Sequence, residues 1–480
     1  MTSSKNFHFN NPLRHHPLCI AILFTLILRV DSAFVPSPRY SVSSILVDKR
    51  LFFFGGLAKD SDGTESCQSS VYYLDISTSF DTDNIPWTDL TKTASIPERI
   101  CWQVNGGGVN SSIVYLFGGI TQNNLTKEVI SDTLVFAFDT KTQQWTKPSI
   151  SDTPPERRRE LSVVQDNSGK MFIFGGLTDP LTGSRSTTWF NDMSILDISN
   201  LSWLFVETSG IDIPPPQADF TATMLSNGTI LYIGGRQSDS ASGTNITYKR
   251  MDQIWTYDTN KGYWRLITTV GTIPGVRAGH SAVLAPSGRI IVYGGVSDNL
   301  LTPASPDLAV LDTSTSPFQW STPNASGTPP PVLAYHSTTL IENYMIVAFG
   351  NKTQGTSRGA SSDIYILDIT SYAWVTAFKS ISPTKTSYDT IQSSDLSTST
   401  QPSSSKTTYS KFIPVNTALI LGVTIGAVIS VSTLCIISFL LFRHWRKYRK
   451  RFGDKLPFSD SITPPADIQM PDLHEGGGRY

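Results

Sequence analysis

The sequence predicts an all-β protein: a six-bladed β-propeller, followed by a disordered stalk, one transmembrane α-helix and a disordered tail. Three observations predict this organisation. An apolar strand that ends in glycine recurs six times, the apolar run from Val415 to Phe442 carries no charge, and only 16% of all residues are charged. Such a composition, rich in glycine, proline, serine and threonine, is typical of β structure with many turns.

Each repeat describes one four-stranded sheet. After the double glycine come a polar loop, a strand that ends in aspartate, and a tryptophan. Glycine is expected where φ is positive or where backbones approach closely, and the tryptophans are expected to be buried between neighbouring sheets. Isolated sheets of this kind have no closed core, so they must stack radially. The repeat residues are Gly55, Gly56, Gly118, Gly119, Gly175, Gly176, Gly234, Gly235, Gly294, Gly295 and Gly350, with Trp87, Trp145, Trp203, Trp264, Trp320 and Trp374.

The repeats also differ from one another at two marks. In the sixth copy we take Gly350 as the first glycine, with Asn351 in place of the second. Upstream of each double glycine lies an Arg-x-x-His-Ser mark, complete only at Arg277–Ser281. We expect its arginine position to be filled elsewhere by Arg39, Arg99, Arg158, Gln217 and Leu333.

This pattern resembles the kelch repeat, as found in the central domain of galactose oxidase, and the whole chain resembles membrane-anchored kelch proteins of fungi. The resemblance covers about Arg39 to Trp374. It implies a propeller that binds partners on the face that carries the long loops after each double glycine. The repeats begin and end in frame, so no strand exchange between the first and last blades is evident.

Two apolar segments predict the topology. Leu18–Leu28 follows basic residues and has the length of a signal-peptide core. The later run is long enough to span a bilayer, and the cations that follow it favour a cytoplasmic tail. We therefore expect a single-pass type I protein of the plasma membrane or an endomembrane. Its parts are a signal peptide (1–33), a propeller (34–378), a stalk (379–413), a span (414–442) and a basic tail (443–480).

Cysteines and glycosylation sequons fit a propeller outside the cytoplasm. Cys67 and Cys101 are the two cysteines of the expected ectodomain, and we predict that they form a disulfide. Asn-x-Ser/Thr sequons occur only between the two apolar segments. We assign Asn124, Asn245, Asn324 and Asn351 to the long-loop face, and Asn110, Asn200 and Asn227 to the face with the hairpin turns.

The favoured function is non-enzymatic: a surface receptor, adhesion protein or scaffold whose propeller binds an extracellular protein or a glycan. Long polar loops on a rigid scaffold suit recognition. The basic candidate rim is interpreted first as a solvated rim whose charges are paired, and a binding site for an anionic ligand is the alternative. A Gly422/Gly426 face on the span suggests a homodimer, and the near-zero net charge of -1 gives no reason to expect nucleic acid. The rim residues are Arg157, Arg158, Arg159, Arg185 and Arg236.

Two other functions stay open. A copper radical oxidase would need two histidines, two tyrosines and a cysteine for the tyrosine cross-link. The expected ectodomain offers only His280 and His336, at equivalent repeat positions, so we expect no metal or other cofactor. The other alternative is an organiser of polarity or of the cell wall that acts through its cytoplasmic tail.

Overall fold

The computed structural model describes residues 34–107, 111–130, 132–206, 213–353 and 359–380. All of them belong to one compact unit. The helices among them are short: α2 (Thr91–Ala94), η1 (Pro180–Thr182) and α3 (Asp298–Leu301). Within these ranges no helix is long and apolar enough to cross a membrane. The expected signal peptide, the expected span and the tail lie outside the described residues.

Six antiparallel sheets of four strands form most of the described structure, two of them with an extra outer strand that pairs in parallel. Sheet one contains β2 (Ser43–Val47), β3 (Arg50–Phe54), β6 (Val71–Asp75) and β8 (Trp87–Asp89). Sheet two contains β10 (Val104–Gly107), β11 (Ile113–Phe117), β13 (Val135–Asp139) and β14 (Gln144–Thr146). Sheet three contains β15 (Val163–Gln165), β16 (Lys170–Phe174), β19 (Met193–Asp197) and β20 (Ser202–Val206). Sheet four contains β22 (Thr221–Met224), β23 (Thr229–Ile233), β26 (Gln253–Asp258) and β27 (Tyr263–Thr268); sheet five contains β29 (Ser281–Leu284), β30 (Arg289–Tyr293), β33 (Leu308–Asp312), β34 (Gln319–Ser321) and the added β28 (Val270–Gly271); sheet six contains β37 (Ser337–Ile341), β38 (Tyr344–Ala348), β41 (Ile364–Asp368), β42 (Ala373–Val375) and the added β35 (Ser326–Gly327).

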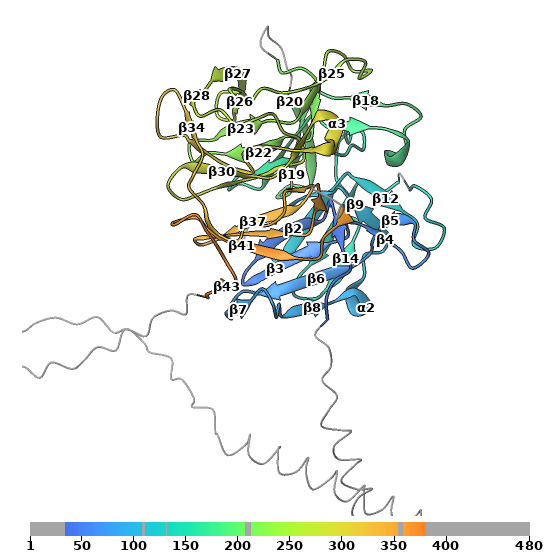
Figure 1. Ribbon diagram of the computed structural model, residues 1–480. Coiled ribbons are helices and arrows are strands. Elements are labelled where there is room, and N and C mark those ends of the chain that lie inside the picture. Colours follow the sequence, from blue (N-terminus) through green and yellow to red (C-terminus); the bar gives the residue numbers. More distant parts are fainter. Residues whose placement is uncertain (1–33, 108–110, 131, 207–212, 354–358, 381–480) are drawn as a thin grey trace, which may run out of the picture. The chain divides into compact units, whose positions relative to one another are not determined.

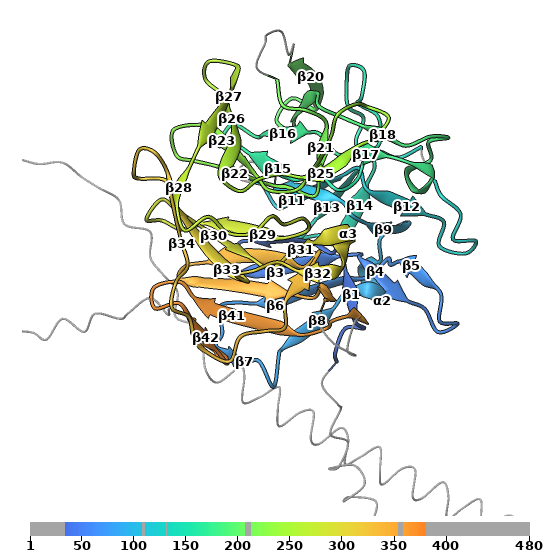
Figure 2. The ribbon, with the colours of Figure 1, turned by 45° about the horizontal axis from the view of Figure 1, so that its top comes forward.

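The sheets are arranged around a central axis (Figures 1 and 2). Their innermost strands contact one another in the order β2, β10, β15, β22, β29, β37 and back to β2. Each sheet takes its four antiparallel strands from its own repeat, so no strand is exchanged between sheets one and six. The predicted all-β propeller is therefore confirmed.

We call the second strand of each sheet, which the glycines follow, its glycine strand. The loops after the glycine strands contribute to smaller sheets, several of which lie at the right of Figure 1. We call the side of the propeller that carries them the loop face. Their strands are β1 (Arg39–Tyr40), β4 (Leu57–Lys59), β5 (Glu65–Cys67), β9 (Arg99–Cys101), β12 (Ile120–Gln122), β17 (Leu177–Thr178), β18 (Thr188–Trp189), β21 (Gln217–Ala218), β24 (Arg236–Ser238), β25 (Ile246–Tyr248), β31 (Val296–Ser297), β32 (Thr302–Pro303), β36 (Leu333–Ala334), β39 (Asn351–Lys352) and β40 (Gly359–Ala360).

The double glycines join each sheet to the next. In sheet three, Gly175 has φ +66°, and a Cβ there would lie 2.7 Å from the carbonyl oxygen of Gln217 in the next repeat. The amide of Gly176 donates to that same oxygen at 2.8 Å. Glycine is thus required both for its conformation and for the close approach. The equivalent bonds are Gly56 to Ile100, Gly119 to Arg158, Gly235 to Arg277, Gly295 to Leu333 and Gly350 to Arg39, all at 2.8–2.9 Å.

These bonds correct the assignment of the sixth repeat. Gly350 donates to the carbonyl of Arg39 and therefore occupies the second glycine position. The first position is held by Phe349, which has φ +61°, the same value as Gly55. The prediction that Asn351 replaces the second glycine was wrong. It assumed that the one glycine present must be the first of the pair, whereas a phenylalanine adopts the backbone conformation of the first position.

The same bonds correct the arginine position of the second repeat. The carbonyl that accepts from Gly56 belongs to Ile100, so Arg99 lies one residue before the repeat position. Arg99 instead contacts the carboxylate of Asp60 at 3.1 Å and the carbonyl of Cys67 at 3.0 Å. Its role is local to the loop face between sheets one and two.

The tryptophans lie between neighbouring sheets, as predicted. Each packs against the last residues of the glycine strand of the preceding sheet. Trp145 lies 5.8 Å from Phe54, Trp264 lies 4.6 Å from Phe174, and Trp87 lies 5.6 Å from Phe349, measured between ring centroids. The other three occupy equivalent positions: Trp203 against Phe117, Trp374 against Tyr293, and Trp320 in the cluster of Leu231 and Ile233.

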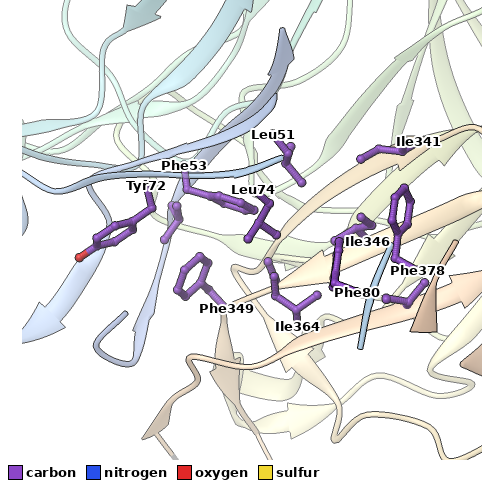
Figure 3. Packing of buried hydrophobic residues seen from close by; sticks show 13 residues of the cluster. Leu51, Phe53, Tyr72, Leu74, Phe80, Ile341, Ile346, Phe349, Ile364 and Phe378 are labelled. Carbon is purple, nitrogen blue, oxygen red and sulfur yellow. The ribbon is translucent and has the colours of Figure 1, made fainter. Parts of the chain in front are cut away.

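The seam between sheets six and one has its own closing contacts. After β42 the chain crosses over, and β43 (Ala377–Phe378) pairs with β7 (Phe80–Asp81). At the other end of the unit, the amide of Arg39 donates to Ser361 at 3.0 Å. Figure 3 shows the apolar cluster of the seam, in which Phe349 lies near Phe53. Both ends of the propeller chain therefore contribute contacts between sheets six and one.

A disulfide and an ion pair join the loops of sheets one and two. Cys67 and Cys101 are bonded to each other. Beside them, the ammonium of Lys127 lies 2.8 Å from the carboxylate of Asp60. The loop face is thus braced at one inter-sheet boundary.

The close approach at the double glycines can be tested with a matched pair of substitutions. Gly175→Ala and Gly63→Ala both force alanine to a positive φ, but a Cβ at Gly63 would have no atom within 4 Å. We expect Gly63→Ala to cost about 1 kcal/mol and Gly175→Ala about 3 kcal/mol, because the added methyl also pushes two sheets apart. Denaturant unfolding of both variants measures the difference, and equal losses would contradict the inter-sheet role.

Candidate partner-binding surface

A ring of six residues surrounds the axis at the loop-face end of the inner strands. Each lies two residues after the arginine position of its repeat, and all six have φ between +53° and +62°. Left-handed conformations are strained for residues other than glycine and mark sites where the surrounding structure enforces them. We call this set the axial ring: Ser41, Trp102, Glu160, Asp219, Gly279 and Tyr335.

Backbone hydrogen bonds link the axial ring from repeat to repeat. The amide of Ser41 donates to Tyr335 at 2.8 Å, that of Tyr335 to Gly279 at 2.8 Å, and that of Gly279 to Asp219 at 3.1 Å. Asp219 then donates to Glu160 at 2.7 Å, and Trp102 donates to Ser41 at 3.2 Å. The ring therefore holds its side chains in fixed positions around the axis.

A network of charges lies on one half of the axial ring. The guanidinium of Arg236 contacts Asp219 at 2.6 Å and Glu160 at 2.8 Å. Arg159 contacts Asp179 at 2.6 Å and also pairs with Glu160. Burial opposes the charge of Arg236, but the carboxylate of Asp219 outweighs it, so the pKa of Arg236 is raised. The network is a preorganised set of three carboxylates and two guanidinium groups.

Aromatic side chains flank these charges. The guanidinium carbon of Arg159 lies 5.6 Å from the ring centroid of Trp102, and that of Arg236 lies 5.3 Å from Trp189. Trp102 and Tyr335 pack edge to face at 6.2 Å. Burial and the nearby charge of Asp219 raise the pKa of Tyr335 well above its usual range. Tryptophan, tyrosine and arginine are the residue types that dominate binding energy in protein interfaces.

The axial ring also carries buried polar atoms without a protein partner among the described residues. They are Oγ of Ser41, Nε1 of Trp102 and Oδ1 of Asp219. Buried polar groups usually find a partner, because leaving one unpaired costs about 1–3 kcal/mol. Their gathering on one ring fits a polar surface that is completed by water or by a bound partner.

The structure corrects the predicted basic rim. Arg157 and Arg158 are buried, Arg158 with only 1% of its surface exposed. Arg158 donates to the carbonyl of Gly175 at 3.2 Å and to the carboxylate of Asp192. They are structural, because a buried guanidinium is stabilised by the carbonyls that it bonds. The other rim residues are at the loop face: Arg159 and Arg236 in the charge network, and Arg185, which is exposed.

Arg157 fills the place of the arginine that the second repeat lacks. Arg39 and Arg277 donate to the carbonyl of the first glycine in their own sheets. Ile100, at the same position of the second repeat, has no side-chain donor for this bond. Arg157 and Gln103 instead donate to that carbonyl of Gly118, each at 3.0 Å. Burial lowers the pKa of Arg157 to about 10, which still leaves it charged near neutral pH.

Lys249 is a buried cation in the fourth repeat. Its ammonium donates to Oε1 of Gln217 at 2.5 Å, and Gln217 is the residue that replaces arginine there. Only 4% of Lys249 is exposed, and burial lowers its pKa to about 7. Sequence reasoning missed Lys249, because its position in a loop gives no signal of burial.

The two histidines lie directly before β29 and β37, the inner strands of sheets five and six. His280 lies 3.2 Å from Oγ1 of Thr221, and His336 lies 2.7 Å from Oγ of Ser281. Burial lowers the pKa of His336 to about 3. Cys67 and Cys101 are joined to each other, so neither is free for the cross-link that a copper radical oxidase requires. No cluster of three or more metal-binding side chains occurs in the described ranges.

The sequons differ in accessibility. Asn351 is half-buried within β39, and Asn110 lies outside the described residues. The exposed sequon asparagines are Asn124, Asn200, Asn227, Asn245 and Asn324.

The chain is similar to several known proteins. The model of the Attractin/LZTR1 β-propeller matches residues 114–401. The chain is 26% identical over 326 residues to Adagio-like protein 3 of Oryza sativa subsp. japonica, covering 66% of this chain and 47% of that protein. It is 28% identical over 250 residues to Host cell factor 1 of Rattus norvegicus, covering 50% of this chain and 11% of that protein. The solved structure of YjhT aligns with a TM-score of 0.46 and 16% identity, over 59% of this chain and 84% of that one. The chain spans about half the length of the Adagio-like relative.

The buried ammonium of Lys249 predicts a pH dependence of stability. Its pKa is about 7 in the folded protein against an ordinary value of 10.5, so between these pH values the unfolded chain binds more protons. The free energy of unfolding therefore rises with pH across this window. We expect Lys249→Met to stabilise the protein at pH 6 by about 2 kcal/mol and to lose this advantage as the pH rises.

Denaturant unfolding of the parent protein and the variant at several pH values measures this effect. Lys261→Met is the control, because the side chain of Lys261 is 69% exposed. A difference between the parent and Lys249→Met that stays constant with pH would contradict the account.

Proposed function

Because the chain belongs to the Attractin/LZTR1 family of kelch-type β-propellers, we propose that its propeller is a rigid scaffold that binds a protein partner at the loop face. The observation that carries the proposal is the axial ring with the arginines beside it. There, arginine, tryptophan and tyrosine side chains lie close to buried polar atoms that have no protein partner among the described residues. Such surfaces supply most of the binding energy of protein interfaces from few residues.

We further propose that six blades complete the ring. The bond from Gly350 to Arg39 supports this, because it repeats between sheets six and one the contact that joins every other neighbouring pair. A rigid closed ring suits the proposed function, since it holds the loops of all repeats around one axis.

The proposed location is outside the cytoplasm, on a membrane-anchored chain of type I. Its support is the apolar run at 415–442 with the cations after it, together with the confinement of the sequons to the preceding region. The bridged pair Cys67 and Cys101 is also typical of an oxidising compartment.

Site-specific photocross-linking tests the binding face. A photoreactive phenylalanine analogue is introduced at Leu181, which is 47% exposed on the loop face, and separately at Asn260, which is exposed at a hairpin turn on the opposite side. We expect a discrete cross-linked partner from intact cells at Leu181 only. Trp102→Ala should weaken the cross-link about tenfold, as expected for a central interface aromatic. A partner captured equally well at Asn260 would contradict the proposal.

Removal of N-linked glycans tests the location. We expect N-glycosidase treatment to lower the apparent mass of the chain, and Asn227→Gln and Asn324→Gln each to remove one step of that shift, because both asparagines are exposed. A chain from its native cells that shows no shift would contradict an extracellular or lumenal propeller.

A further inference from the structure

Two adjoining cavities lie at the seam between sheets six and one, away from the axial ring. The larger, which we call the seam groove, has a volume of about 750 Å³ and is lined by β41, β42 and the chain after β7. The smaller, which we call the side pocket, has a volume of about 170 Å³. They share Thr82, Asp83, Asp363 and Ile364. The volume of the seam groove is ordinary for a ligand site.

The seam groove exists because the outer strand of sheet six ends early. β42 pairs with β41 only from Ile366 to Asp368, and the chain then leaves to pair β43 with β7. The outer strands of sheets two and five also pair over only three residues, whereas that of sheet four pairs along all six residues of its neighbour. The outer edge of β41 at Ile364 and Tyr365 therefore faces the groove without a strand upon it in the described structure. Such an edge is a template for an added strand.

The side pocket has apolar walls and an acidic rim. Ile85, Trp87 and Ile364 line it, and Asp83 and Asp363 stand where it opens into the groove. This is the arrangement that suits a lysine or arginine side chain, whose aliphatic stem packs on apolar surface while its cation stays at the polar rim. The indole of Trp87 adds a cation–π surface.

The rim carboxylates are available to a new partner. The bonds of Asp363 from Lys352, Ser361 and Tyr365 all go to Oδ2. Its Oδ1, and the exposed carboxylate of Asp83, have no partner within the described residues. The groove as a whole is lined by three carboxylates and one ammonium, with Asp368 and Lys379 as the other two charges.

We propose that the seam groove binds an extended peptide segment of a partner protein, which adds a strand to β41 and places a lysine or arginine in the side pocket. Backbone hydrogen bonds along β41 give affinity, and the acidic rim selects the basic residue. This site is independent of the loop-face surface, so either can fail without the other.

Fluorescence anisotropy on the purified full chain tests the proposal with three labelled probes. They are acetylated, amidated pentapeptides of alternating threonine and valine, with lysine, arginine or glutamate at the centre. We expect the lysine and arginine peptides to bind saturably and the glutamate peptide to bind at least about tenfold more weakly. Asp83→Asn should weaken the lysine peptide about tenfold, and high salt should weaken it as well. The matched control is Asp298→Asn, an exposed carboxylate in α3, which should change nothing.

A lysine peptide methylated on its backbone nitrogens separates strand addition from binding by charge alone. We expect it to lose binding, because it cannot donate to the edge of β41. Equal binding of the glutamate peptide, indifference to Asp83→Asn, full binding of the methylated peptide, or no binding of the lysine peptide at millimolar concentration would each overturn the proposal. Unfolding midpoints of the variants that match the parent protein show that the comparison concerns folded protein.

Discussion

One contact holds the ring together: the amide of the second glycine of each repeat donates to a backbone carbonyl in the next repeat. The bond lies where two sheets meet, away from water, so leaving it unmade would cost about 1–3 kcal/mol. It forms only because the preceding residue has a positive φ and, in five repeats, no side chain. The same contact, repeated six times, sets how each sheet is placed against its neighbour. The tryptophans then fill the wedge between neighbouring sheets further from the axis.

The structure keeps this contact constant and varies what surrounds it. Arg39 and Arg277 satisfy the carbonyl of the first glycine in their own sheets. The second repeat meets the same need with Gln103 and Arg157. The axial ring shows the opposite behaviour, because its six positions share one backbone conformation and carry six different residues. Constancy at the glycines and diversity two residues after the arginine position are what a scaffold for specific binding requires.

The repeat pattern was sufficient to predict the propeller, since glycine and tryptophan each have a strong physical reason to occur where they do. It was not sufficient at positions where another residue meets the same demand. Phe349 adopts the conformation of a first glycine, and its bulk is accommodated only because the apolar seam of sheets six and one surrounds it. Arg157 and Arg158 read as surface residues because burial of a guanidinium depends on carbonyls that come from distant parts of the chain. Asp219 and Tyr335 could have been found by aligning the repeats on the arginine position. Trp102 could have been found in the same way only with the second repeat placed on Ile100 rather than Arg99.

The seam between sheets six and one departs most from the pattern of the other boundaries between sheets. It contains the non-glycine residue at a first-glycine position, the crossover of β43 to β7, the seam groove and the side pocket. A closed ring requires a contact at every boundary between sheets. This boundary therefore keeps the common hydrogen bond, here from the amide of Gly350 to the carbonyl of Arg39.

Amide hydrogen exchange at the second-glycine positions tests the central claim most directly. If the inter-sheet bonds hold the ring, the amides of Gly56, Gly119, Gly176, Gly235, Gly295 and Gly350 should exchange only through global unfolding, with protection equal to the free energy of unfolding. Fast exchange of these amides in a protein whose sheet amides stay protected would contradict the account, because the sheets would then hold together without them.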